Sequence, residues 1–286
     1  MKKWGIIFLG FLIFQGCSNQ DIKKTSLEKE EYYILRGMSF YHKGNVTEAL
    51  KNYEKANSIN KRNIIVLREL ALVQYELGDS KESIKNYKKV LELDKHDEIA
   101  LKNLGIIMFS QGNYFESEKY LKSVEKNLHG TQTLKALGLI MYKKGNIQEA
   151  QNYLKRSITM NNIYDEEMFV VYSQILFDKK EKEALYYFLK NEYNKYLTDK
   201  NFNLFYARVL GEKLDAWEKS ELILKKYIIE TEATDEIYLM LGYIYYEMGL
   251  YSQSSLMLKL ISNSNIDNKD YIILQKKLSE IRELNY

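Results

Sequence analysis

Apolar and polar positions after residue 29 follow one helix–turn–helix pattern several times over. Each copy contains two amphipathic segments, and a glycine marks the turn between them. The first four of these glycines stand 34, 34 and 33 residues apart, and a fifth returns in a later copy: Gly44, Gly78, Gly112, Gly145 and Gly249. Glycine at such a turn permits the positive φ angle that a reversal between helices needs. The period predicts an all-α solenoid of stacked helix pairs, each packed on its neighbours.

The first copy, residues 30–63, shows the side-chain pattern in full. Large residues stand at its positions 4, 11 and 24 and small residues at positions 8, 20 and 27; in chain order they are Tyr33, Gly37, Phe40, Ala49, Tyr53 and Ala56. This pattern resembles the tetratricopeptide repeat, in which the two helices cross closely where positions 8 and 20 meet. The resemblance spans about residues 30–286, although the chain has no proline for position 32. It implies a right-handed solenoid whose first helices line an inner groove.

Seven repeats and a final helix account for the chain after residue 29. Four regular repeats occupy residues 30–164, two degenerate repeats 165–234, one further repeat 235–268 and a capping helix 269–286. In the repeat that starts at Asp165, Ala184 fits position 20, but Tyr172 falls at position 8 and Asn191 at position 27. In the next repeat, the second helix (residues 216–230) is shifted by one residue. We expect altered stacking there, with a bend at residues 192–200, although sequence drift without function explains the substitutions equally well.

The first sixteen residues have the pattern of an export signal. Two lysines precede an almost wholly apolar run at residues 4–14, and eleven helical residues rise only about 16 Å, too little to cross a hydrocarbon core of about 30 Å. The end of the run resembles the lipobox of bacterial lipoproteins: Gly16 and Cys17 match it, whereas Phe14 and Gln15 depart from it. The resemblance implies cleavage before Cys17, acylation of Cys17 and a polar tether over residues 17–29.

The resemblance also bears on localisation. Several acyl chains on Cys17 would anchor the protein stably to a membrane of the cell envelope. Ser18 follows the cysteine where some lipoproteins carry an aspartate that retains them at the inner membrane, so the outer membrane is favoured if the cell has one. An ordinary signal peptide with an incidental cysteine is the alternative, and it would leave a soluble secreted protein.

Composition and motifs argue against several classes of function. Lys and Arg total 42 against 39 for Asp and Glu, a balance that predicts no nucleic-acid binding. The single cysteine excludes an intramolecular disulfide and a multi-cysteine zinc site. The three histidines are scattered, and no nucleophile elbow, phosphate-binding loop or dinucleotide fingerprint is present. We therefore expect no enzyme activity, no cofactor, no metal site and no small-molecule substrate.

The resemblance assigns positions 2, 5, 9, 12 and 13 of each first helix to the inner groove. Position 12 of the regular repeats gives four aromatic residues: Tyr41, Tyr75, Phe109 and Tyr142. Position 5 gives three cations in successive repeats: Arg68, Lys102 and Lys135. Together they predict a groove for an extended peptide that carries carboxylates and apolar side chains. Aromatic residues at position 12 also occur as ordinary packing residues, and tyrosines and a methionine at 31–38 and 243–247 would suit a helical partner as well.

These features together predict a membrane-anchored interaction scaffold. The protein would act as an adaptor or assembly factor that holds a protein partner at the bacterial cell envelope, in the manner of the repeat lipoproteins that it resembles in architecture. The alternative is a periplasmic regulator that binds cell-wall enzymes. Position 9 offers Met38, Leu72 and Ile106, which does not match the carboxylate clamp of chaperone-binding repeats, so chaperone C-termini are not the expected ligand.

Overall fold

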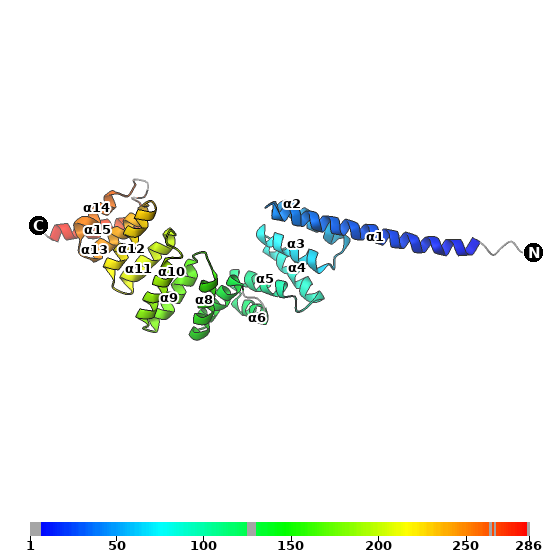
Figure 1. The fold of residues 1–286 in the computed structure, drawn as a ribbon, viewed down its shortest axis with the longest axis horizontal. Helices are drawn as coiled ribbons and strands as arrows, with labels where there is room; N and C mark the ends of the chain where they lie inside the picture. The colour runs from blue at the N-terminus through cyan, green and yellow to red at the C-terminus, as the bar shows by residue number, and fades with distance from the viewer. Residues whose placement is uncertain (1–6, 125–129, 263–264, 266, 285–286) are drawn as a thin grey trace, which may run out of the picture. The chain divides into compact units, whose positions relative to one another are not determined.

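The computed structural model describes residues 7–124, 130–262, 265 and 267–284, and this part of the chain is built from helices alone (Figure 1). The chain forms two compact units, Met1–Leu137 and Gly138–Tyr286. The first unit holds α1 (Ile7–His42), α2 (Val46–Ile59), α3 (Ile64–Glu76), α4 (Ser80–Leu93), α5 (Glu98–Ser110) and α6 (Tyr114–Val124). The boundary between the units falls within α7 (Thr131–Lys143).

The second unit continues the same alternation of helices. It holds α8 (Ile147–Met160), α9 (Glu166–Asp178), α10 (Lys182–Tyr193), α11 (Lys200–Glu212), α12 (Trp217–Glu230), α13 (Asp235–Glu247), α14 (Tyr251–Lys259) and α15 (Lys269–Leu284). The odd-numbered helices from α1 to α13 are the first helices of the repeats, and paired helices pack on each other, as α3 does on α4 and α13 on α14. The predicted all-α array of helix pairs is confirmed.

The close crossing within each pair depends on small residues. At Gly105, a Cβ atom would lie only 2.4 Å from the Leu121 side chain, and at Gly37 only 2.6 Å from the Tyr53 ring. Ser117 fills position 20 opposite Gly105 and donates a hydrogen bond of 2.7 Å to its carbonyl oxygen. The position-24 side chain is buried in all seven repeats: Tyr53, Tyr87, Leu121, Leu154, Leu189, Leu224 and Leu258. The crossing therefore forms the core of each repeat, as the pattern predicts.

The turn between the paired helices corrects the predicted register of the fifth repeat. Five glycines have φ values of 74° to 87° at this turn, and Lys180 holds the same conformation with φ of 61°. The turn glycine is position 15 of a regular repeat. If Lys180 is position 15 of the fifth repeat, that repeat begins at Glu166, one residue later than predicted. Ser173 and Leu185 are then its crossing residues, and both are fully buried, whereas Ala184 is exposed.

The corrected register of the fifth repeat also changes the positions assigned to Tyr172 and Asn191. Tyr172 is not the crossing residue; its buried ring contacts Phe188 with centroids 4.7 Å apart. Asn191 moves to position 26 and is exposed. The prediction was wrong because it took the capping residue Asp165, which accepts from the Met168 amide, as the first residue of the helix.

The sixth repeat contains the one-residue shift that the sequence predicts. Its turn residue is Asp215, with φ of 51°, and α12 begins at Trp217, one residue later than the other second helices do relative to their first helices. The Trp217 ring lies against Gly211, where a Cβ atom would come within 2.2 Å of it. The crossing itself is still made by small residues, because Ser220 donates a hydrogen bond of 2.6 Å to the carbonyl oxygen of Ala207.

Aromatic rings pack around residues 192–200, where altered stacking was expected. Phe202 is fully buried, with ring centroids 5.1 to 5.9 Å from four neighbours: Tyr164, Phe169, Tyr196 and Tyr206. Tyr196 follows the end of α10 and donates a hydrogen bond to the carbonyl oxygen of Asn161. Aromatic packing thus replaces the aliphatic and small residues of the regular repeats at this junction.

The last helix covers the final repeat. The sequence places Tyr271, Leu274, Leu278 and Ile281 on one apolar stripe, and α15 buries Leu274 and Leu278 in a cluster with Leu258 and Ile261. Its Ile272 and Ile273 remain 50% and 44% exposed. The predicted capping role of this helix is confirmed.

The N-terminal segment is helical as far as it is described. Helix α1 includes residues 18–29 of the predicted tether. These twelve residues rise about 18 Å as helix and would reach about 40 Å when fully extended. Among the described residues, no helix has the length and apolar character that crossing a membrane requires. Residues 1–6 of the predicted signal and the side chain of Cys17 lie outside the described part, so acylation of Cys17 stays a prediction.

Candidate functional site

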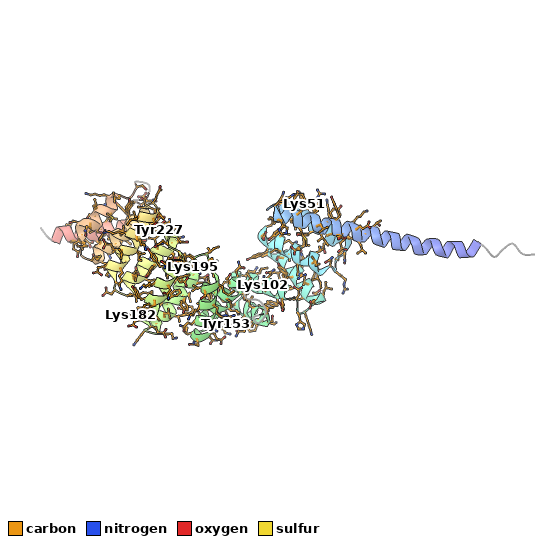
Figure 2. The ribbon with its side chains drawn as sticks, in the orientation of Figure 1. Lys51, Lys102, Tyr153, Lys182, Lys195 and Tyr227 are labelled. Carbon is orange, nitrogen blue, oxygen red and sulfur yellow. The ribbon has the colours of Figure 1, made fainter. Side chains whose placement is uncertain are left out.

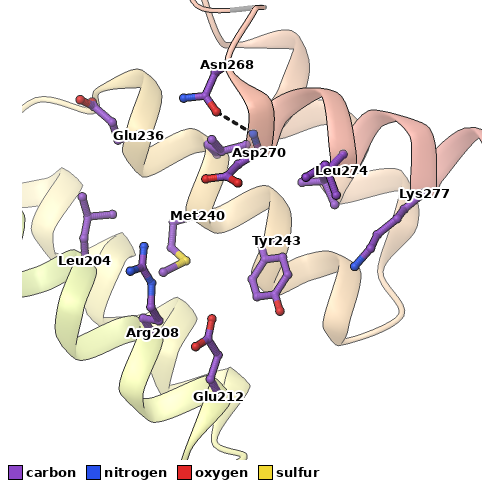
Figure 3. A pocket seen from close by; sticks show the side chains of 12 residues that line it. Leu204, Arg208, Glu212, Glu236, Met240, Tyr243, Asn268, Asp270, Leu274 and Lys277 are labelled. Atoms are coloured by element: carbon purple, nitrogen blue, oxygen red, sulfur yellow. Dashed lines mark hydrogen bonds between the residues drawn. The ribbon is translucent and has the colours of Figure 1, made fainter. Parts of the chain in front are cut away.

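A groove of about 600 Å³ opens between α11, α13 and α15 in the second unit (Figure 3). It is lined by side chains from these three helices and the turn before α15: Leu204, Arg208, Glu212, Glu236, Leu239, Met240, Tyr243, Asn268, Asp270, Ile273, Leu274 and Lys277. Leu204, Arg208 and Glu212 are spaced four residues apart, so they share one face of α11. They are positions 5, 9 and 13 of their repeat, all of which the family pattern assigns to the inner groove.

The floor of the groove is apolar and rigidly supported. Met240 and Leu274 are almost fully buried, while Ile273 is 44% exposed at the edge. The ring of Tyr243 packs edge-to-face on Trp217, with centroids 5.8 Å apart. Trp217, the first residue of α12, therefore supports the groove's central aromatic residue.

Charged groups of both signs surround this floor. The Lys277 ammonium lies 5.1 Å from the centre of the Tyr246 ring, and Glu236 pairs with Lys200 at 3.1 Å. Asn268 accepts from the Asp270 amide at 2.8 Å and so begins α15. Arg208 and Glu212 are exposed, and neither makes an ion pair within the described part of the chain. These two side chains are therefore available to an incoming partner.

Burial is the main cause that raises the pKa of the Tyr243 hydroxyl; the carboxylates of Glu247 and Glu212 raise it further, whereas the Arg208 guanidinium lowers it. Charges of both signs therefore act on this hydroxyl. Among the described residues, no group of three His, Cys, Asp or Glu side chains could hold a metal ion. The groove is thus arranged for contact with apolar and charged side chains.

The predicted aromatic column and cation row are divided between the two units. Tyr142 belongs to the second unit, and the other six predicted residues belong to the first. Tyr41 donates a hydrogen bond of 2.5 Å to Glu76, and this bond is the main cause that raises the pKa of Tyr41 to about 12. Tyr75 packs against the core cluster around Leu67 and Tyr87. Phe109 contacts the Tyr114 ring, with centroids 5.8 Å apart.

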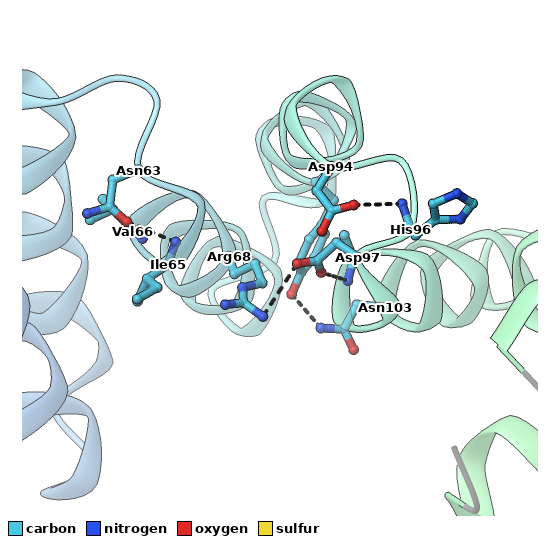
Figure 4. Close-up of polar contacts among 10 residues, drawn as sticks. Asn63, Ile65, Val66, Arg68, Asp94, His96, Asp97 and Asn103 are labelled. Atoms are coloured by element: carbon cyan, nitrogen blue, oxygen red, sulfur yellow. Dashed lines mark hydrogen bonds and ion pairs between the residues drawn. The ribbon is translucent and has the colours of Figure 1, made fainter. Parts of the chain in front are cut away.

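Arg68 is engaged in the contact between two repeats (Figure 4). Its guanidinium lies 3.5 Å from a carboxylate oxygen of Asp97, which is 8% exposed. Asp97 also accepts from the Ala100 amide at 2.8 Å and so caps α5. The cation therefore stabilises the start of the next repeat, which is a structural role that the spacing of charges alone does not reveal.

The other two cations of the row lie on α5 and α7. Lys102, which Figure 2 marks on α5, is half-buried and makes no ion pair within the described residues. Lys135 is half-buried on α7. Lys102 thus remains the member of the row best placed to meet a partner.

The sequence interpretation missed two features of the inner positions. In the corrected register, Phe177 stands at position 12 of the fifth repeat, and the Lys213 ammonium lies 4.7 Å from the centre of its ring. Most of the groove residues of α11 and α13 also stand at positions that the family pattern assigns to the inner groove. The sequence therefore contains the signal for this site, although these repeats lack the regular glycine period of the first four.

Comparison with known proteins agrees with this architecture. The family model described as "Tetratricopeptide repeat" matches residues 30–63 and 69–97. No curated protein matches the chain significantly.

Several solved structures share the fold. Pseudomonas aeruginosa pilF is 14% identical with a TM-score of 0.51, and the match covers 88% of this chain and 99% of that one. A tetratricopeptide repeat protein from Parabacteroides merdae is 16% identical with a TM-score of 0.57, covering 88% and 98%. MamA from Desulfovibrio magneticus RS-1 is 14% identical with a TM-score of 0.51, covering 60% and 97%. At these identities the likeness concerns the fold, and the chain is an all-α array with tetratricopeptide repeats at residues 30–63 and 69–97.

Proposed function

We propose that the protein is a lipid-anchored interaction scaffold of the bacterial cell envelope, which holds a protein partner in the groove between α11, α13 and α15. The tetratricopeptide-repeat fold is generally a scaffold for protein–protein interaction, and its inner surface is the usual place of contact. The observation that carries the proposal is the groove itself, in which an apolar floor of Met240, Leu274 and Tyr243 is bordered by charged side chains.

This lining has the character of a protein interface. Interfaces combine a buried apolar centre with a polar rim, and aromatic residues, methionine and arginine are enriched in them. Met240, Tyr243 and Arg208 belong to these types and lie in one groove. A partner side chain on this floor would gain from apolar burial, and the rim charges would select its orientation.

The test is photo-crosslinking in cells. A photoreactive amino acid at Tyr243 should crosslink to a defined partner, because this residue lies at the centre of the groove. The same substitution at Tyr187, which is 56% exposed on α10 outside the groove, is the matched control and should give little product. Equal crosslinking from both sites, or none from Tyr243, would refute a partner site in the groove. A cell-wall hydrolase or synthase as the crosslinked protein would favour the regulatory alternative.

The anchor rests on the sequence around Cys17, the only cysteine of the chain, which stands three residues after the end of the apolar run. Cys17→Ala should abolish acyl labelling and move the protein from the membrane fraction to the soluble fraction. Cys17→Ser is the closer control for size and should behave in the same way. Unchanged labelling and fractionation of both variants would show that the protein is not anchored through Cys17.

A further inference from the structure

We propose that the groove between α11, α13 and α15 receives a partner segment that carries a Lys or Arg side chain next to an apolar side chain. This inference rests on the proposed scaffold function and specifies the chemistry of the partner. The charge of this segment is opposite to that of the acidic peptide that the cation row of the first unit predicts.

The cation would lie beside Tyr243 and Glu212, which line the groove, on the side where Glu247 follows Tyr243 on α13. Figure 3 shows Glu212 and Tyr243 on neighbouring helices, both lining the groove. Glu247 lies four residues after Tyr243 and therefore on the same face of α13. Trp217 supports the Tyr243 ring from α12, which leaves an aromatic surface next to two carboxylates. An ammonium or guanidinium group is attracted both by an aromatic face and by carboxylates.

The helix that carries Tyr243 and Glu247 favours the same sign of partner. Helix α13 has three carboxylates and no basic side chain, whereas α11 and α15 carry charges of both signs. Helix α13 therefore contributes only negative charge beside the groove, and this charge attracts a cationic segment.

Two cations in the groove limit where the partner's cation can lie. Arg208 stands one turn before Glu212 on α11, and Lys277 lies over Tyr246 on α15. Glu236, near the other end, is already paired with Lys200. The partner's cation is therefore directed to Glu212 and Glu247, and its neighbouring apolar side chain can rest on Leu239, Met240 and Ile273.

The experiment is selection of a random peptide library on the full chain in detergent micelles, followed by measurement of the selected peptides' dissociation constants. We expect selected peptides to be enriched in Lys or Arg beside apolar residues. Glu212→Lys combined with Glu247→Lys should weaken their binding about tenfold, since two attractive charges become repulsive. Arg208→Glu should strengthen their binding about threefold, because a repulsive charge is removed from the same groove.

A matched control makes the same change of charge outside the groove. Glu183→Lys combined with Glu218→Lys alters exposed residues in the first turns of α10 and α12, and it should leave binding unchanged. If the lysine variant of the groove does not fold, Glu212→Gln combined with Glu247→Gln provides a milder test with weaker but still reduced binding. Circular dichroism checks the fold of each variant.

The outcomes separate this inference from the scaffold function. Acidic or neutral selected peptides, or dissociation constants that do not respond to the groove charges, would overturn the cationic partner. The scaffold function would survive that result if Tyr243 still crosslinked to a partner in cells. Absence of that crosslink together with a failed selection would overturn both.

Discussion

Inner-face polar groups are used differently in the two units. In the first unit they bind each other across consecutive repeats: Tyr41 donates to Glu76, Arg68 pairs with Asp97, and buried Glu30 accepts from Asn63 at 2.6 Å. In the second unit, Arg208 and Glu212 remain exposed beside a groove with an apolar floor. The regular repeats therefore use several polar inner positions for stacking, whereas the sixth repeat leaves Arg208 and Glu212 open to a partner.

The irregularity of the second unit also has a structural use. In the sixth repeat, Gly211 stands at position 12, where the regular repeats carry an aromatic residue, and the Trp217 ring lies over it and against Tyr243. The aromatic rings around Phe202 join α9 and α11 to the segment that follows α10. Departures from a repeat pattern are thus not only loss of regularity. They can supply the large side chains that shape a site.

The largest expected effect is a loss of stability that stays within one of the two units. Phe202→Ala should destabilise the fold by about 3 to 5 kcal/mol, because it empties a fully buried site between four rings. Repeats contact mainly their neighbours, so amide hydrogen exchange should accelerate in α9 to α11 and stay unchanged in α2 to α4. Tyr87→Ala in the first unit should give the reverse pattern. Uniform acceleration along the whole chain from either variant would show that the units do not unfold independently.

The next effect distinguishes a structural cation from a free one. Arg68→Met keeps the aliphatic stem but leaves the carboxylate of Asp97 without its cation, and it should cost about 1 to 3 kcal/mol. Lys102→Met is the matched control in the next repeat and should change the unfolding free energy little, since Lys102 has no ion pair among the described residues. Urea unfolding monitored by circular dichroism measures both. Equal costs for the two variants would contradict the structural role of Arg68.

Turn residues provide a comparison of smaller size. Gly78→Ala should destabilise the first unit by about 1 kcal/mol, because an L residue at φ of 87° is strained. Lys180→Gly should stabilise the second unit by about 0.5 kcal/mol, since it removes such strain at φ of 61° and adds some flexibility to the unfolded chain. Thermal unfolding of both variants checks the opposite signs. A loss of stability on Lys180→Gly would mean that the lysine makes a compensating contact.

The smallest effect concerns Tyr41 and pH. Its pKa is raised to about 12, first by the hydrogen bond to Glu76, above an ordinary value of 10. The folded state thus favours the protonated hydroxyl, so this contribution to stability is complete below pH 10 and is lost as the pH rises from 10 to about 12. The difference between the ultraviolet titrations of the wild type and Tyr41→Phe should show one tyrosine that ionises near pH 12. An ordinary pKa in that difference would exclude the bond in solution.

The sequence was sufficient to predict the fold because its main determinants are local. The positive-φ glycines, the small residues at the helix crossing and the stripe of Leu274 and Leu278 all lie at fixed spacings, and the structure confirms each. The fifth repeat was misplaced by one residue because Lys180 holds a turn conformation that glycine holds in the regular repeats. A lysine in the sequence does not indicate a positive φ angle, so this turn could not be recognised before the structure was known.

The site was harder to predict because partners within the chain are distant in sequence. Arg68 and Asp97 are 29 residues apart, and Tyr41 and Glu76 are 35 residues apart. The inner positions could be identified from the pattern, but whether a charge at such a position is already paired depends on how consecutive repeats stack. The open groove of the second unit became evident only once that stacking was known.

The most direct measurement compares the two units as partner sites in one experiment. A photoreactive amino acid is placed at Lys102 in the first unit or at Tyr243 in the second, and crosslinked products are quantified in cells. The assignment of the site to the second unit predicts a strong, defined product from Tyr243 and little from Lys102. A strong product from Lys102 with none from Tyr243 would contradict it and return the site to the regular repeats.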